Sequence, residues 1–284
     1  MRGIDISNWQ RGFNLSEASV DFAIFKATGG NSYVDPTCNG FVQQAKKAGK
    51  LWGFYHFAKD GCASQDGAKE ADFFMSKTTG YWGSGLPVLD LEDNGILDWA
   101  AYTKAFVNRI YEKKNVYPVI YTGLTGIARL KGTGVLEKCK VWFAGYPLGY
   151  INYWLSESAT PRNYYSIDNA AQIIMWQFTS AVPIQGFNVD ANLCYISKAE
   201  WNKLVKGSGQ VTPSTPTESE VAEAMAMTAK ELEAISKQVW SYRNKNLEKV
   251  DAYAIMRRNR DSLAKIEKQL TAIGKKLDAI AKKL

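Results

Sequence analysis

Eight short apolar segments, separated by polar stretches, dominate the first 206 residues and restrict what this part of the chain can fold into. Most of them are apolar on both faces, which is typical of strands buried on both sides of a parallel sheet. Such strands need helices packed against them. The segments are GIDIS (3–7), FAIFKA (22–27), LWGFYHF (51–57), PVLDLE (87–92), PVIYT (118–122), VWFAGY (141–146), IIMWQF (173–178) and NVDANL (188–193).

Helical patterns lie between several of these segments, at 38–48, 67–77 and 98–113. Strands that alternate with helices predict the α/β class. Eight strands in so short a stretch fit an irregular (β/α) TIM-like barrel better than an open, doubly wound sheet. No GxGxxG or GxxxxGK[ST] motif follows any segment, so a nucleotide-binding fold has no support.

A stretch of Gly, Ser, Thr and Pro, GSGQVTPSTPT, marks a domain boundary at 207–217. Trp, Tyr and Gly are frequent before it, whereas Ala, Lys and Glu dominate after it. Flexible linkers have this composition. The sequence therefore predicts a barrel domain over 1–206, a linker over 207–217 and a small all-α module over 218–284.

The end of the predicted module carries a heptad pattern. Its apolar residues are spaced alternately three and four apart, which predicts a coiled-coil seam. The residues are Leu263, Ile266, Leu270, Ile273, Leu277, Ile280 and Leu284. Leu at a and Ile at d shift the preference towards trimers or tetramers. The alternative is an intramolecular hairpin, in which an acidic helix over 217–242 packs on the basic segment 243–284.

The formal net charge of +7 is concentrated at the same end, where residues 243–284 hold 12 Lys/Arg and 5 Asp/Glu. By charge alone this basic segment could bind nucleic acid, an anionic membrane or an anionic wall polymer, or it could be a solvated helix face. We expect no nucleic acid as partner and a homo-oligomer formed through these helices.

Composition excludes several classes of protein. No apolar run approaches the length of a membrane span, and the N-terminus has no signal-peptide pattern. The chain has 4 Cys, widely spaced, and 1 His, which disfavours a metal site or a disulfide scaffold. We expect neither a metal nor a cofactor. Its 9 Trp, 15 Tyr and 12 Phe suit flat ligands such as sugars.

In an α/β barrel the active site lies at the carboxyl ends of the strands, and polar residues at these ends are the candidates. Carboxylates are costly to bury there without a purpose. The candidates are Asp5, Ser7, Lys26, Tyr55, His56, Asp90, Glu92, Tyr121, Tyr146, Trp176, Gln177 and Asp190.

Asp90 and Glu92 form the sharpest pair. Side chains two apart on a strand share a face, so both carboxylates are expected to point into one site at different depths. Like charges so close push one pKa up, which gives one acid and one anion near neutral pH. Glycoside cleavage needs this combination. Two surface carboxylates or a divalent metal site are the alternatives.

Two other residue types are less specific. His56 could act as a general base, but a histidine between Tyr55 and Phe57 is more often a packed core residue. Trp52, Trp142 and Trp176 could each be core, and one or two of them are expected to line a sugar groove.

Taken in series, the strand-end motifs resemble glycoside hydrolase family 25, the lysozymes of the Chalaropsis type, which include many phage endolysins. The resemblance covers residues 1–205 and none of the C-terminal segment. It rests on DISNWQ (5–10), FKAT (25–28), GFYHF (53–57), PVLDLED (87–93), PVIYTG (118–123), VWFAGY (141–146), MWQF (175–178) and FNVDAN (187–192).

The resemblance implies an irregular (β/α) barrel and an N-acetylmuramidase that cuts the β-1,4 bond from N-acetylmuramic acid to N-acetylglucosamine in bacterial peptidoglycan. It implies that Glu92 is the general acid/base and that Asp90 supports the charge or the N-acetyl group of the substrate. Asp5 and Asp190 are similar to further site carboxylates. The substrate-binding residues that we expect are Lys26, Tyr55, Tyr121, Tyr146, Trp176 and Gln177.

One motif departs from the family pattern. Many members have Lys-Ala-Thr-Glu-Gly after the second strand, whereas here Thr28 is followed by Gly29 and Gly30. The departure puts one strand-end contact in doubt but leaves the central pair intact.

Three biological settings fit these features. A phage or prophage endolysin held in the host cytoplasm until lysis is favoured by the lack of a signal peptide. A bacterial autolysin of the same family and a barrel that binds wall glycan without cutting it are the alternatives.

Overall fold

The computed structural model describes residues 1–92, 95–169 and 171–207. Within this part of the chain, nine strands form one sheet in the order β1-β9-β8-β7-β6-β5-β4-β2-β3. Because β1 also pairs with β2, eight of these strands close into a barrel. The strands are β1 (Arg2–Ile6), β2 (Phe22–Gly29), β3 (Tyr33–Val34), β4 (Leu51–Phe57), β5 (Leu86–Asp90), β6 (Val119–Thr122), β7 (Val141–Ala144), β8 (Ile173–Ile184) and β9 (Phe187–Cys194).

The last strand of the barrel runs against the others, which corrects the prediction of a purely parallel sheet. β9 is antiparallel to both of its neighbours, β1 and β8. It follows β8 through a two-residue hairpin turn in which Gln185 and Gly186 both have positive φ, 54° and 80°. Such turns match the twist of the strands that they join. The eighth strand therefore enters the barrel from the opposite end.

Five α-helices lie within the described residues: α1 (Cys38–Lys47), α2 (Gly67–Lys77), α3 (Trp99–Lys114), α4 (Leu124–Leu130) and α5 (Lys198–Lys206). The first three confirm the predicted helical patterns, and α4 and α5 were not predicted. The side chains of Asp66 and Asp98 accept backbone N–H bonds at the N-termini of α2 and α3, which fixes where these helices begin.

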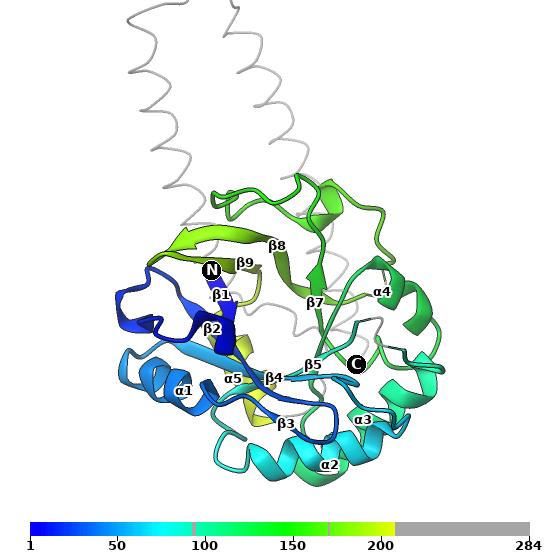
Figure 1. Cartoon of the computed structure of the whole chain (residues 1–284). Helices are drawn as coiled ribbons and strands as arrows, with labels where there is room; N and C mark the ends of the chain where they lie inside the picture. Colours follow the sequence, from blue (N-terminus) through cyan, green and yellow to red (C-terminus); the bar gives the residue numbers. More distant parts are fainter. Residues whose placement is uncertain (93–94, 170, 208–284) are drawn as a thin grey trace, which may run out of the picture. The chain divides into compact units, whose positions relative to one another are not determined.

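Helices α1 to α4 lie around the outside of the strands (Figure 1). The described residues between β7 and β8 form no α-helix, only a short 3₁₀ turn over Pro161–Asn163. This connection packs Leu155 and Ile167 against the strands. The result is a closed eight-stranded barrel with flanking helices, with a less regular cover beside β8.

Two apolar layers hold the barrel together. The outer layer lies between strands and helices and includes Phe54, Leu89 and Phe143. The inner layer fills the barrel with side chains such as Val88 and Met175. Alternate residues enter the two layers in strands such as β7, where Trp142 is inside and Phe143 outside, as the pleat of a barrel strand requires.

Helix α5 closes the barrel at the end where β2 begins. Trp201 and Val205 belong to the inner layer, and the Trp201 ring lies 5.3 Å from the Phe22 ring. The helix ends at Gly207, a left-handed C-cap. With this end filled, the opposite end of the barrel is available for a site.

The rest of the predicted linker and the whole predicted module, 218–284, lie outside the described residues, so the domain limits, the heptad seam and the hairpin alternative stay predictions. Within the described part of the chain, no helix has both the length and the apolarity to cross a bilayer.

Candidate active site

The carboxyl ends of the parallel strands form one end of the barrel, which we call the mouth. Strand registers place several predicted residues side by side there: Lys26 next to Tyr55, and Asp90 next to Tyr121. Asp190 lies opposite Asp5, because β9 runs in the reverse direction and brings its N-terminal half to this end.

Asp5 is the centre of a hydrogen-bond network in the mouth. It is only 6% exposed. Gln177 Nε2 donates to both of its carboxylate oxygens, at 3.0 and 3.2 Å, and Asn192 Nδ2 donates to Oδ1 at 2.7 Å. These amide donors favour the ionised form of Asp5, whereas burial favours the protonated form.

Each amide is oriented by a second partner. Trp142 Nε1 donates to Asn192 Oδ1 at 2.8 Å, which turns the NH₂ group of Asn192 towards Asp5. Tyr121 and Tyr146 donate their hydroxyl protons to Gln177 Oε1 at 2.7 and 2.6 Å. A reversed amide would place its oxygen against the Asp5 carboxylate. The network therefore fixes the side-chain amides of Gln177 and Asn192 with their NH₂ groups towards Asp5.

Asp5 and Asp190 titrate together. Burial raises the pKa of both, and the charge of Asp5 together with a hydrogen bond between the two carboxyl groups raises that of Asp190 further. Two adjacent carboxylates in a poorly hydrated site cannot both ionise at low cost. Asp190 thus keeps a proton that it shares with Asp5 near neutral pH.

Asp90 lies at the end of β5 and is 7% exposed. Its pKa is raised well above the usual range, mainly by burial and then by the charges of Glu92 and Asp5, while Lys26 lowers it. Its Oδ1 atom is buried and has no hydrogen-bond partner among the described residues. An unpartnered acceptor in the mouth is available to a ligand donor.

Glu92 lies beyond the strand. The sequence predicts a strand over 87–92, but β5 ends at Asp90, because Leu91 and Glu92 lead into the following loop. Leu91 packs outward in the outer layer, so the alternation continues and Glu92 faces the mouth. Glu92 is exposed to solvent on one side, and partial burial raises its pKa. The two carboxylates thus lie at different depths.

The tyrosines at the mouth stay protonated. Burial raises the pKa of Tyr55 and Tyr121 well above the usual range, and the charge of Asp90 adds to the effect for both. Their hydroxyl groups are therefore neutral hydrogen-bonding groups around the carboxylates.

A bulge in β2 separates the direction of Lys26 from that of Thr28. Lys26 pairs with Tyr55 but Thr28 pairs with His56, so one extra residue, Ala27, is inserted between them. A bulge turns the side chains that follow it to the other face. Lys26 precedes the bulge and faces the mouth by ordinary alternation, on the same face of β2 as Ile24 of the inner layer. Thr28 follows the bulge, faces outward and contacts His56.

The prediction that Trp176 lines the groove is wrong for this structure. Its side chain is 0% exposed and packs in the outer layer, where its Nε1 donates to Gly145 O at 2.8 Å. Trp52 and Trp142 are buried as well, at 5% and 2%. The adjacent residue, Gln177, faces the mouth instead. Of the aromatic side chains in the described part of the chain, Trp9, at 83% exposed, and Tyr150, at 76%, are the most accessible.

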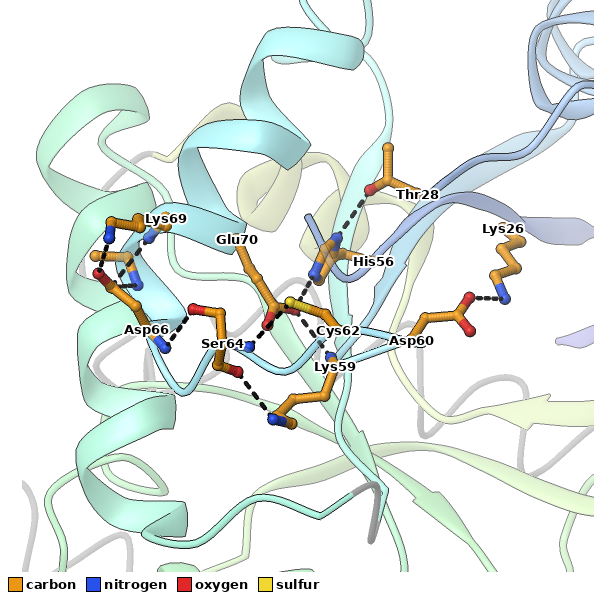
Figure 2. A network of polar contacts seen from close by, with 11 residues as sticks. Lys26, Thr28, His56, Lys59, Asp60, Cys62, Ser64, Asp66, Lys69 and Glu70 are labelled. Atoms are coloured by element: carbon orange, nitrogen blue, oxygen red, sulfur yellow. Dashed lines mark hydrogen bonds and ion pairs between the residues drawn. The ribbon is translucent and has the colours of Figure 1, made fainter. Parts of the chain in front are cut away.

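His56 is a packed residue, as the more conservative interpretation predicts. It is 0% exposed and lies between β4 and the helices. Its Nδ1 is 2.8 Å from Thr28 Oγ1 and its Nε2 is 3.0 Å from Glu70 Oε2, as Figure 2 shows. Burial lowers the pKa of the imidazole. It faces away from the mouth and cannot serve there as a base.

Sequence reasoning missed Asn192 and the role of Trp142. Asn192 is two residues after Asp190 and therefore shares its face of β9, which is the signal that could have found it. Across residues 1–92, 95–169 and 171–207, no group of three or more His, Cys, Asp or Glu side chains is arranged to hold a metal ion.

A closed barrel with four carboxyl groups at its mouth is an arrangement typical of glycoside hydrolases. The model of glycosyl hydrolases family 25 matches residues 4–187, and the chain belongs to this family. The N,O-diacetylmuramidase of Chalaropsis sp. is 34% identical over 140 residues, which are 43% of this chain and 65% of that protein. The chain thus spans less than two thirds of that curated relative.

Two solved structures share the barrel. The bacterial lysozyme from Streptomyces coelicolor is 26% identical, with a TM-score of 0.60 over 74% of this chain and 98% of that one. The catalytic domain of the endolysin ply40 from bacteriophage P40 of Listeria monocytogenes is 23% identical, with a TM-score of 0.52 over 73% and 98%. The second likeness concerns the fold alone.

Proposed function

We propose that the chain is an N-acetylmuramidase, a lysozyme that hydrolyses the β-1,4 bond from N-acetylmuramic acid to N-acetylglucosamine in bacterial peptidoglycan. One observation carries the proposal: Asp90 is buried and Glu92 solvent-exposed at the same mouth, and both have a raised pKa. Family membership and the relative described as a muramidase support the choice of substrate.

Glu92 acts as the general acid. Its raised pKa keeps a fraction of the side chain protonated near neutral pH. It gives this proton to the glycosidic oxygen as the bond to the anomeric carbon breaks, and N-acetylglucosamine leaves with its hydroxyl restored. The Glu92 carboxylate then takes a proton from the water that attacks the anomeric carbon.

Asp90 faces the positive charge that develops at the anomeric carbon, and this charge, together with that of Lys26, favours the ionised form of Asp90 against the effect of burial. Two routes agree with its buried position. Its carboxylate forms an ester with that carbon, or the acetamido oxygen of the substrate closes an oxazoline ring while Asp90 accepts the N–H bond. The unpartnered Oδ1 atom suits either route.

Asp5, Asp190, Gln177, Tyr121 and Tyr146 form the hydrogen-bonded floor of the site. A network in which every donor faces an acceptor holds its members in one geometry. We propose that this floor, with Tyr55 and Lys26 beside it, orients the sugar ring over Asp90.

The test is mass spectrometry of purified peptidoglycan after digestion. We expect new reducing ends that carry N-acetylmuramic acid. Reducing ends that carry N-acetylglucosamine would refute the bond assignment. Failure to release any glycan would leave the second candidate, a barrel that binds wall glycan without cutting it, which the four carboxyl groups at the mouth argue against.

An endolysin is the biological setting that we propose, with an autolysin as the alternative. The likeness to a phage endolysin domain supports the shared barrel. In this setting the protein stays in the host cytoplasm until the membrane is breached. Expression in a susceptible host tests this: lysis should follow only after a pore-forming agent is added, and spontaneous lysis would contradict it.

For residues 218–284 we propose wall binding, self-association, or both, on the basis of the heptad pattern and the basic charge of 243–284. Light scattering on the isolated segment 218–284 tests self-association. A monomeric mass at micromolar concentration would defeat the oligomer and leave wall binding, which co-sedimentation with cell walls measures.

A further inference from the structure

The Lys26 ammonium is held at the edge of the mouth by three groups. Asp60 Oδ2 lies 2.8 Å from Nζ, and the rings of Tyr33 and Phe57 lie 4.8 and 4.6 Å from it. The Lys26 side chain is 18% exposed. An ammonium against two aromatic faces and a carboxylate is held more firmly than one in water.

This position is unexpected on electrostatic grounds. Four carboxyl groups, those of Asp5, Asp90, Glu92 and Asp190, lie in the mouth, and the tyrosines Tyr55 and Tyr121 stay neutral beside them. Lys26 is within electrostatic range of Asp90. A lysine with no other partner would be drawn towards these carboxylates.

Two glycines leave the space in which Asp60 packs. A Cβ atom on Gly29 would lie 2.4 Å from Asp60 Oδ2, and one on Gly30 would lie 2.6 Å from the Asp60 carbonyl oxygen. Both distances are far below van der Waals contact. Gly30 also has a φ of +51°, in the left-handed region that glycine adopts without strain. The end of β2 thus lacks side chains where Asp60 packs.

Backbone hydrogen bonds on both sides of Asp60 fix the turn that carries it. Lys59 N–H donates to Glu70 Oε2 at 2.9 Å, and the same oxygen contacts His56 Nε2 (Figure 2). The Cys62 N–H closes the turn on the Lys59 carbonyl at 3.0 Å. Buried Glu70 therefore fixes the backbone next to Asp60, so the carboxylate is presented to Lys26 from a rigid support.

The segment that carries Asp60 is also hydrogen-bonded to the end of β5, the strand that carries Asp90. Ala58 N–H donates to the Asp90 carbonyl oxygen at 2.9 Å. The segment that positions Asp60 and the segment that carries Asp90 therefore keep a fixed separation, which also fixes the place of Lys26 relative to Asp90.

We propose that Asp60 is a positioning residue that holds the Lys26 ammonium at the edge of the mouth and keeps it from pairing with the catalytic carboxylates. The activity readout of this inference rests on the proposed function. Asp60 acts through Lys26 and does not itself contact the reacting atoms.

The first experiment compares the pH dependence of kcat/KM for wild type, D60N, K26M and the double variant. In D60N, Lys26 moves towards Asp90 and stabilises its ionised form, so the acidic limb shifts to lower pH by about 1 unit. In K26M the acidic limb shifts to higher pH. Because Asp60 acts through Lys26, D60N should add no further shift in the K26M background.

Two further variants sharpen the comparison. G29A keeps the charge of Asp60 but displaces its side chain, and should reproduce the D60N shift. D72N removes an exposed aspartate that pairs with Arg109 on the outer helices, and should leave the profile unchanged. A D60N profile equal to wild type, or a D60N shift that persists in full in K26M, would overturn the proposal.

A crystal structure of D60N gives a readout that does not depend on activity. We expect Nζ of Lys26 within ion-pair distance of a mouth carboxylate. Lys26 still seated on Tyr33 and Phe57 would overturn the proposal even for an active enzyme. If wild type released no glycan, the proposed function would fail, and this structure would still decide the role of Asp60.

Discussion

Asp190 lies directly opposite Asp5 in the β1–β9 pair, with Asp5 buried and Asp190 half-buried. The pair is possible because the closing strand is antiparallel. Two carboxyl groups in this position share a proton, which couples the stability of the barrel to pH.

The carboxyl groups of the mouth are expected to destabilise the fold as pH rises. Burial raises the pKa of Asp190 from 3.8 to about 9 in the folded state. Between these two values the native state binds more protons than the unfolded state, so the free energy of unfolding falls with increasing pH. The melting temperature should therefore be higher near pH 5 than near pH 8. An unchanged melting temperature over this range would contradict the shift.

Replacing one of these groups by its amide should stabilise the protein at neutral pH. D190N and D90N each remove a carboxyl group whose pKa is raised in the folded state, and we expect the melting temperature to rise by a few °C, at about 2–4 °C per kcal/mol. Activity should fall in both variants. D72N, which alters an exposed carboxylate, is the matched control and should change neither quantity much. Lower melting temperatures in both variants would show that their hydrogen bonds outweigh the cost of burial.

E92Q should lose nearly all hydrolysis while it keeps the fold, because an amide cannot give a proton to the leaving oxygen. General acid–base catalysis is typically worth about 10² to 10⁴ in rate. The measurement is glycan release together with circular dichroism. E112Q, on the exposed face of α3, serves as control. Near-normal turnover of E92Q would assign the proton to another group.

N192A tests the network beneath Asp5. The substitution leaves Trp142 Nε1 without its acceptor and removes one of the two hydrogen bonds to Asp5 Oδ1, so that only the bond from Gln177 remains there. A buried unsatisfied group costs about 1–3 kcal/mol. We expect a lower melting temperature and reduced kcat. N188A, at an exposed position of the same strand, should be close to neutral. Equal melting temperatures for the two variants would mean that Asn192 holds neither partner.

H56Q separates packing from catalysis. Glutamine can still contact Thr28 and Glu70, but it fills less of the space between Phe74 and Phe106. We expect lower thermal stability with nearly unchanged kcat and an unchanged pH profile, because His56 lies outside the mouth. Loss of activity in folded H56Q would restore the general-base interpretation.

A truncated protein tests whether residues 1–207 form an independent catalytic domain. Residues 1–207 contain both apolar layers and the whole mouth, so this fragment should fold and cleave soluble glycan fragments. Intact cells should be lysed less well than by the full chain, since avidity is lost. Equal lysis of whole cells by both forms would contradict a targeting role for 218–284.

Much of the barrel could be predicted because most of its strands are recognisable in the sequence as short runs of apolar residues. The apolar segments at 51–57 and 141–146 become β4 and β7, and the helical pattern at 67–77 becomes α2. Polar residues at strand ends likewise indicated Asp5, Asp90 and Gln177. The direction of β9 could not be predicted, because a short strand has the same alternation read either way.

The sequence misplaced Trp176 in the groove and did not reveal the direction of Thr28, and both failures have one cause. A strand pattern shows which residues share a face but not which face is inside the barrel. Trp176 and Gln177 are neighbours on β8, and only the amide faces the mouth. The bulge at Ala27, which separates the directions of Lys26 and Thr28, likewise depends on pairing with β4. Such features arise from tertiary contacts.

Strand β9 also sets the order of events during synthesis. Asp5 emerges from the ribosome first, yet Gln177, Asn192 and Asp190 come from the last two strands of the barrel. Ribosomes release chains from the N-terminus, so the barrel cannot close until β9 has emerged. A chain that has been made only as far as β7 contains Asp90 and Glu92 but lacks Gln177 and Asn192, the two amide donors for Asp5. The hydrogen-bond network around Asp5 therefore joins the first strand of the barrel to its last two, and it can form only after β9 has been synthesised.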